Sequence, residues 1–198
     1  AIQDYDRGLI IGQNTFGKGS VQGFKKTNFG QIKLTESLYY RVTGKPTQIL
    51  GVKPNLEIPT LLDVNEFGES KYPSALKPNT ISEATFFKKT PLNISKYKEI
   101  LAENIKESSY FKSLFEIKQS RGLKKTRLSL NLSERQEMNK KEKINSLKLV
   151  NESRIISNLK PFSSYEEFEN YNSETGFEID AEIDQSAKIL YEIIEAKI

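Results

Sequence analysis

The chain has 198 residues, of which 36% are hydrophobic and 28% charged, with a formal net charge of +4. This composition is typical of a globular protein, and the apolar runs are too short to cross a membrane. Cysteine and histidine are both absent, which excludes disulfides and thiol nucleophiles and removes the commonest metal ligand. We therefore expect no metal site, and any acid–base chemistry must depend on Lys, Asp, Glu or Tyr.

The first residues, Ala1-Ile-Gln-Asp-Tyr, look like the tail of a helix and do not begin with methionine. We interpret the chain as a piece of a longer protein, in which any targeting segment would lie elsewhere. A short apolar strand is expected at residues 9–11, and the alternation that starts at Gly30 is typical of a half-buried strand. Turns are expected at residues 43–46 and 51–55, which contain glycine and proline.

The sequence pattern of the rest of the chain changes twice. Prolines at positions 73, 78 and 91 mark residues 63–91 as a connector, and from residue 92 the periodicity is helical. The expected fold class is therefore α+β, with a β-rich part at residues 1–62 and a mainly α-helical part at residues 92–198.

Within the helical part, Ser95 is the expected N-cap of a first helix, and a second apolar stripe ends near Gly122. Alternating leucines at residues 128–132 suggest a short strand. Residues 133–136 fit a capping box that opens a long polar helix. The last helix has the clearest pattern, because its apolar residues recur at helical spacing: Ile183, Ala187, Leu190 and Ile194.

Charge in this part is unevenly distributed. Residues 124–143 contain seven basic and three acidic side chains, whereas residues 162–187 contain eight acidic ones and no Lys or Arg. The basic stretch lacks interleaved aromatic residues. We interpret it as a solvated helix face that pairs with the acidic region rather than as a nucleic-acid surface.

The sequence GQNTFGKGSVQ, residues 12–22, holds Lys18 between two glycines. It nearly fits the phosphate-binding pattern G-x-x-x-x-G-K-[ST], but Gly19 stands where the magnesium-binding hydroxyl should be. No helical stripe follows, which disfavours a phosphate loop. The residues alone leave two readings open: a surface hairpin with a solvated lysine, or a lysine that another segment approaches closely because glycine leaves room.

Residues 4–12 and 15–22 resemble the segment that carries the catalytic lysine in tail-specific proteases, also called carboxyl-terminal processing proteases. The similarity continues to residue 56, with Asn55 where aspartate is usual. Residues from Glu66 onward resemble the C-terminal extension of the long bacterial members. The resemblance implies the end of a crotonase-like protease core followed by a helical C-terminal domain.

In that family a serine attacks the peptide carbonyl and a lysine takes its proton. The resemblance makes Lys18 the general base and Gln22 the residue that orients it, and it places the nucleophilic serine upstream of Ala1. Only a neutral amine can act as a base, so we expect Lys18 to be buried in its glycine-lined turn. Ser20 should point the same way as Lys18 but is not expected to be the nucleophile. Asp4 could be a helper, although a plain solvated acid is the favoured interpretation.

The resemblance further implies a periplasmic serine endopeptidase that needs no cofactor and selects proteins by their nonpolar C-termini. Its substrate-binding residues are unknown, and residues 1–198 alone are expected to be inactive. The alternative is a binding or scaffolding module, in which the helical part docks a lipoprotein adaptor or a second protomer. Neither reading involves nucleic acid or a transmembrane segment.

Overall fold

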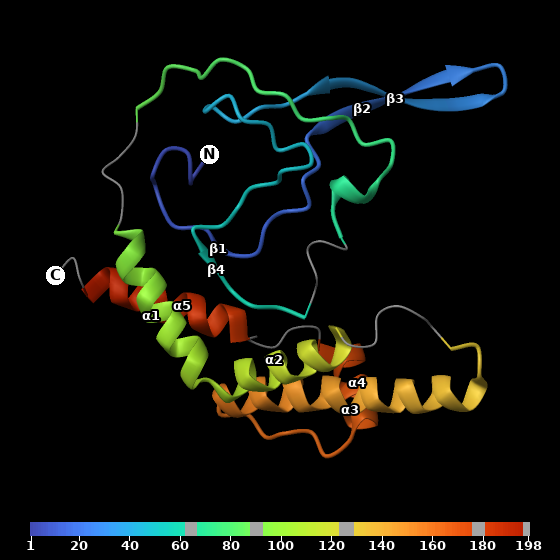
Figure 1. Ribbon diagram of the computed structural model, residues 1–198, viewed down its shortest axis with the longest axis vertical. Helices are drawn as coiled ribbons and strands as arrows, with labels where there is room; N and C mark the ends of the chain where they lie inside the picture. Colours follow the sequence, from blue (N-terminus) through green and yellow to red (C-terminus); the bar gives the residue numbers. More distant parts are fainter. Residues whose placement is uncertain (62–66, 88–92, 123–128, 176–180, 196–198) are drawn as a thin grey trace. The chain divides into compact units, whose positions relative to one another are not determined.

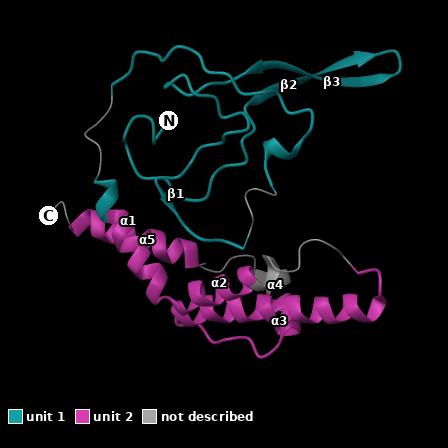
Figure 2. Cartoon of the chain, in the orientation of Figure 1, with its two compact units in different colours: residues 1–96 teal, residues 97–198 magenta. Residues whose placement is uncertain are grey.

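The computed structural model describes residues 1–61, 67–87, 93–122, 129–175 and 181–195, and the chain divides into two compact units, residues 1–96 and 97–198 (Figure 2). Strands lie in the first unit and helices fill the second, so the α+β class is confirmed (Figure 1). The elements are β1 (Ile11–Gly12), β2 (Ser20–Thr27), β3 (Gly30–Leu38), β4 (Leu56–Glu57), η1 (Glu69–Lys71), α1 (Ile94–Glu107), α2 (Ser109–Gly122), α3 (Leu132–Ile156), α4 (Tyr165–Thr175) and α5 (Ala181–Glu195).

Two separate strand pairs organise the first unit. The expected strand at residues 9–11 is present as β1, slightly shifted, and it pairs in parallel with β4. β2 and β3 form an antiparallel hairpin with an irregularity between Val21 and Gln22. Sequence patterns did not predict β2, because its residues are mostly polar and Gly23 interrupts them. Pairing with β3 supplies the hydrogen bonds that its composition does not predict.

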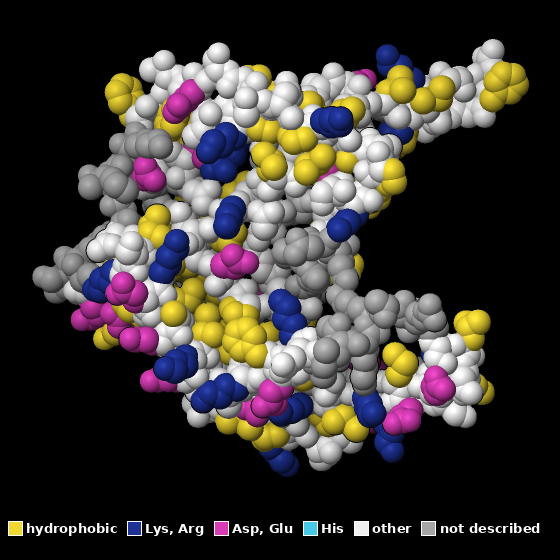
Figure 3. Space-filling view, in the orientation of Figure 1, with side chains coloured by type: hydrophobic (Ala, Val, Ile, Leu, Met, Phe, Trp, Pro, Cys, Tyr) yellow, Lys and Arg dark blue, Asp and Glu magenta, His cyan; other side chains and the backbone are white. Residues whose placement is uncertain are grey.

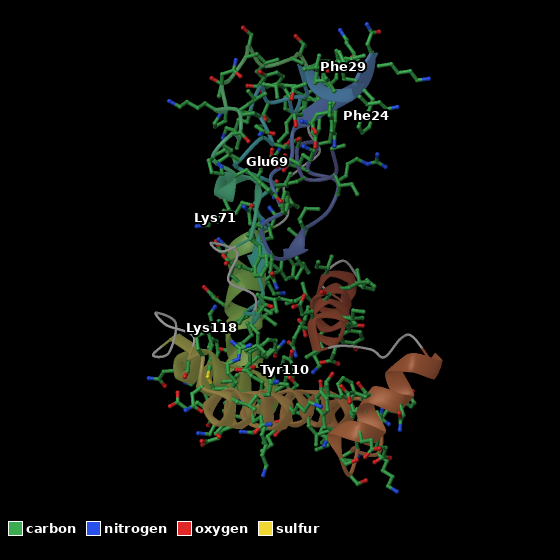
Figure 4. The ribbon with its side chains drawn as sticks, turned by 90° about the vertical axis from the view of Figure 1, so that its right-hand side faces the viewer. Phe24, Phe29, Glu69, Lys71, Tyr110 and Lys118 are labelled. Carbon is green, nitrogen blue, oxygen red and sulfur yellow. The ribbon has the colours of Figure 1, made fainter. Side chains whose placement is uncertain are left out.

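The expectation of a half-buried β3 is wrong. Ile32 and Leu34 are exposed, as are Phe24 and Phe29 on the same hairpin. Figure 3 shows hydrophobic side chains gathered along the projecting hairpin, and Figure 4 shows Phe24 and Phe29 on it. The alternation correctly indicated a strand, but burial requires a second layer, and among the described residues none covers these side chains.

Both predicted turns are confirmed. Gly44 (φ 72°) and Gly51 (φ 64°) adopt left-handed conformations, which glycine tolerates without strain. The second turn leads to Leu56 and Ile58, which are fully buried. Asn55 stabilises this turn, because its Oδ1 accepts hydrogen bonds from the backbone N–H of Ile10 (2.9 Å) and from the Gln3 side chain (3.1 Å). An amide oxygen thus makes contacts that a carboxylate oxygen could also make.

Asp4 is not the solvated acid that the sequence favoured. Its side chain is buried and forms a two-pronged ion pair with Arg41, which also contacts Gln3 through Nη2 at 2.7 Å. A helical turn at residues 1–5 carries Asp4, so the pair ties this turn to the segment after β3. Tertiary pairing supplies the guanidinium that a buried carboxylate requires.

Asparagine side chains, not the expected serines, cap α1 and α3. Asn93 accepts a hydrogen bond from the backbone N–H of Lys96 at the start of α1, where Ser95 was expected to cap. Asn131 accepts from the N–H groups of residues 133 and 134 and opens α3. The helix therefore starts two residues before the expected capping box, and Leu132 is helical instead of strand-like. Leu128 lies outside the described residues.

Apolar helix faces form the core of the second unit. Helix α2 contributes Phe111, Leu114 and Ile117, and it packs against α3, which buries Leu149. Helix α4 also packs against α3. The last described residue of helix α2 is Gly122, and residues 123–128 lie outside the described part.

The turn between α3 and α4 is fixed by side chains. Asn151 accepts from and donates to the backbone of Phe162, at 2.8 and 2.9 Å. The guanidinium of Arg154 lies 4.0 Å from the centre of the Phe162 ring. These contacts explain why the chain reverses direction here without glycine.

The apolar face of α5 is exposed. Leu190 keeps 56% of its surface accessible, and Ile183 and Ile194 are also exposed. The buried residues Ala181, Gln185 and Ile189 lie on the opposite side of the helix, because a helix turns by about 100° per residue. Periodicity identified an apolar face but could not tell which face the rest of the chain covers.

The expected pairing of basic and acidic regions is present in part. Lys143 on α3 lies 3.9 Å from a carboxylate oxygen of Glu169 on α4, and its ammonium lies 4.8 Å from the centre of the Tyr165 ring. Lys148 pairs instead with Glu116 of α2. Residues 124–127 lie outside the described part. None of the helices described is long and apolar enough to span a membrane.

Candidate functional site

The turn around Lys18 is built by two glycines that allow another segment to come close. A Cβ atom on Gly17 would lie 2.8 Å from the carbonyl oxygen of Ile49, and one on Gly19 would lie 2.5 Å from the backbone nitrogen of Gln48. The backbone of Ile49 donates to the carbonyl of Gly17 at 2.7 Å. The close approach expected from these glycines is therefore confirmed.

Lys18 immediately precedes β2, and its amine reaches side chains of that strand. Nζ donates to Oγ of Ser20 at 3.0 Å and to Oε1 of Gln22 at 3.4 Å. The hydroxyl of Tyr39 donates to the carbonyl of Lys18 and holds its backbone from the side of β3. A strand rather than a helix follows the lysine, so the geometry of a phosphate loop is absent here.

Gln22 is itself fixed by the hairpin. Its Nε2 donates to Oγ1 of Thr35 at 3.2 Å, across the β2–β3 pair. With the amide nitrogen engaged there, the amide oxygen faces Lys18. The orientation of Gln22 is thus set by strand pairing, which brings together residues 13 positions apart in sequence.

These side chains line one pocket of about 390 Å³. β2 and β3 form one wall, with Lys33 further along β3. Gln48 lies at the inner side, and η1 with the following residues, from Glu69 to Leu76, forms another wall. Glu69 is a residue that the sequence interpretation missed, because a single acid in a proline-rich connector gave no signal.

The expected burial of Lys18 is wrong for this chain, since its side chain retains 46% of its accessible surface. Glycine permits backbone segments to approach but contributes no side chain to cover an amine. The amine is nevertheless engaged, because Ser20 and Gln22 accept its hydrogen bonds and an oxygen of Glu69 lies 3.9 Å away. Ser20 points toward the amine, as expected.

Within the described residues, no group of three carboxylate, histidine or cysteine side chains could hold a metal ion. The polar side chains that line the pocket carry two amines, several hydroxyls, two amides and one carboxylate. This set suits hydrogen bonding and proton transfer to a polar organic group.

Comparison with known families divides the chain near residue 60. The model of peptidase family S41 matches residues 1–58, which include Lys18 and Gln22. The model described as the C-terminal domain of tail specific protease matches residues 62–195. Glu69 and the pocket wall that follows it therefore fall in the second match.

Individual relatives match parts of the chain. A tail-specific protease of Haemophilus influenzae is 40% identical over 102 residues, 47% of this chain and 15% of the relative. A carboxy-terminal-processing protease of Bartonella bacilliformis is 41% identical over 59 residues, 29% of this chain and 14% of the relative. An uncharacterized protein of Chlamydia muridarum is 37% identical over 76 residues, 36% and 13% of the two chains.

The matched part of the chain thus covers no more than 15% of the length of these relatives. The two family matches follow one another along nearly the whole chain, one in each part, and both bear names of proteases. The chain belongs to the tail-specific protease family.

Proposed function

We propose that this chain carries the general base of a serine endopeptidase of the Ser/Lys type. The observation that carries the proposal is the hydrogen bond from Lys18 Nζ to Gln22 Oε1, with Gln22 held by Thr35. Because the Gln22 amide nitrogen is held by Thr35, its oxygen is a fixed acceptor for one N–H of the lysine amine. This hydrogen bond orients the rest of the amine toward the pocket. A Ser/Lys pair needs such orientation because lysine is otherwise flexible.

The chemistry follows from a serine that lies upstream of Ala1, as the resemblance implies. Its hydroxyl gives a proton to the neutral amine of Lys18 while Oγ attacks the peptide carbonyl carbon. The resulting ammonium returns the proton to the leaving amine as the C–N bond breaks. Water then hydrolyses the acyl-enzyme by the same proton path, releasing a new carboxylate and regenerating serine.

The half-exposed state of Lys18 sets a requirement for this mechanism. A neutral amine is favoured when water is excluded, and the pocket as described leaves Lys18 partly open. We propose that the remainder of a crotonase-like protease core, together with bound substrate, covers the open side. The intact enzyme would act in the periplasm on proteins recognised by nonpolar C-termini, with no cofactor.

The test uses the full-length protein and a fluorogenic peptide with a nonpolar C-terminus. Lys18→Ala should lower kcat by about 10²–10⁴-fold, the usual contribution of a general base. Gln22→Ala should lower kcat by about 10–100-fold through misplacement of the amine. Lys26→Ala, which removes an exposed lysine of β2, is the matched control and should leave activity unchanged. Full activity in Lys18→Ala would refute the proposal.

A Ser20 variant tests whether the nucleophile lies upstream or in this chain, because among the acceptors described the Ser20 hydroxyl lies nearest the Lys18 amine. If the nucleophile lies upstream, Ser20→Ala retains most of the activity and residues 1–198 alone cleave neither casein nor the peptide. Turnover by residues 1–198 that disappears in both Ser20→Ala and Lys18→Ala would instead identify Ser20 as the nucleophile.

A second function, docking of a partner, is favoured by α5. Its apolar residues Ile183, Leu190 and Ile194 are exposed, whereas a surface helix normally buries such a face. We propose that this face binds a lipoprotein adaptor or a second protomer. The double variant Leu190→Ser, Ile194→Ser should abolish that association in light scattering or pull-down with the intact protein, and Glu195→Ser is the control. If deletion of residues 92–198 from the full-length protein changes neither its oligomeric state nor its partner binding, this function is excluded.

A further inference from the structure

Glu69 lies in the lysine pocket although it belongs to the part of the chain that matches the C-terminal domain. It opens the 3₁₀ helix η1 (Figure 4), and its side chain is largely buried. Its Oε1 lies 3.9 Å from Nζ of Lys18. Its backbone N–H donates to the carbonyl of Phe16 at 2.9 Å. Both its backbone and its side chain therefore contact the turn that presents the lysine.

Gln48 connects Glu69 to the other side of this turn. Its side chain is 1% exposed, and a buried amide must satisfy both of its ends. Oε1 accepts from the backbone N–H of Gly19 at 2.8 Å, and Nε2 donates to Oε1 of Glu69 at 3.0 Å. Because the Gln48 amide points its nitrogen at Glu69, that carboxylate oxygen is held in one place. A chain of polar contacts thus links Gly19 to Gln48, Gln48 to Glu69, and Glu69 to Lys18.

We propose that Glu69 is a positioning residue for the Lys18 base, which rests on the proposed function. A base that accepts a proton becomes an ammonium, and a fixed carboxylate close by stabilises the charge that develops. The buried aspartate of the Ser-His-Asp triad acts on its histidine in the same sense. Through Glu69, the segment that follows the peptidase match forms part of the catalytic centre.

The contact is one of charge rather than of a short hydrogen bond, since 3.9 Å exceeds hydrogen-bond length. Lys33 from β3 and Tyr72 after η1 also line the pocket. The Tyr39 hydroxyl is engaged with the Lys18 carbonyl. Glu69 is the one carboxylate among the described residues that line the pocket, so its removal leaves the positive charges of Lys18 and Lys33 without a counter-charge there.

Glu69→Gln in the full-length enzyme separates charge from shape. Glutamine keeps an oxygen that can accept from Gln48 but removes the negative charge. We expect kcat to fall about fivefold, the scale of a partly exposed charge pair, with KM unchanged. The acidic limb of the kcat profile should move to lower pH, because the ammonium form loses its nearby carboxylate.

Glu69→Asp, which keeps the charge, should restore part of kcat and return the pH profile toward that of the parent. Glu57→Gln, an exposed glutamate of β4, is the matched control and should change neither quantity. Circular dichroism reports whether each variant is folded.

Two results would overturn the inference. One is a Glu69→Gln enzyme with the parent kcat and pH profile. The other is a loss of activity that follows the folded fraction while the pH profile stays fixed, which would make Glu69 only structural. Retained activity in Lys18→Ala would instead refute the proposed function itself, so the two failures are distinguishable.

Discussion

The two units of the chain are stabilised in different ways. In residues 1–96, polar contacts between distant segments predominate: Asp4 pairs with Arg41, Gln48 with Glu69, and Asn55 with Ile10. In residues 97–198, apolar helix faces meet, with Phe111 and Leu114 fully buried on α2. A side chain that must present an amine in a defined direction requires the first kind of stabilisation, because hydrogen bonds are directional and apolar packing is not.

The comparison predicts where substitutions act most strongly on stability. Phe111→Ala in the helical unit removes a large, fully buried ring from α2 and should lower the free energy of unfolding by about 3–5 kcal/mol. Urea denaturation followed by circular dichroism measures this value. The control is Phe115→Ala on the same helix, where the ring is exposed and the expected loss is below about 1 kcal/mol. Equal losses would show that α2 does not bury its face as described.

A smaller effect is expected from crowding the polar turn. Gly19→Ala places a Cβ within 2.5 Å of the Gln48 backbone nitrogen, so the two segments must separate. We expect a loss of about 1–3 kcal/mol, typical of overpacking, together with faster hydrogen exchange at the residue 19 amide, which donates to Gln48.

Gly8→Ala is the matched control, because its added Cβ would meet only the end of the Ile2 side chain at 3.3 Å. If the Gly19 variant keeps both stability and exchange protection, the close approach of the two segments is not required for folding of this unit.

The smallest effect concerns a single carboxylate at the start of α4. Hydrogen bonds from the Ser163 hydroxyl and backbone N–H, at 2.6 and 2.7 Å, lower the pKa of Glu167. A lowered pKa in the folded state means that Glu167 stabilises α4 above its ordinary pKa and that this contribution disappears as the pH falls through the folded value. In a carbon-detected NMR titration, Ser163→Ala should raise the pKa of Glu167 toward its ordinary value. An unchanged titration would contradict the capping contact, and Glu166 serves as the internal reference.

Local sequence rules succeeded where local physics decides the structure. The turns at Gly44 and Gly51 and the close backbone approach at Gly17 and Gly19 all follow from glycine's conformational freedom and small size. The rules placed the helix caps less well, because Asn93 and Asn131 compete with nearby serines for the same role.

The chain by itself determined the α+β order of elements, the glycine turn around Lys18 and the resemblance that identifies the family. Tertiary structure alone decided which face of α5 is covered, that Asp4 is buried against Arg41, that Lys18 stays half exposed and that Glu69 reaches its pocket. The physical reason is that periodicity and turn chemistry act over a few residues. Burial and charge pairing depend instead on segments that meet only after folding, such as those of Lys18 and Glu69, which lie 51 positions apart in the sequence.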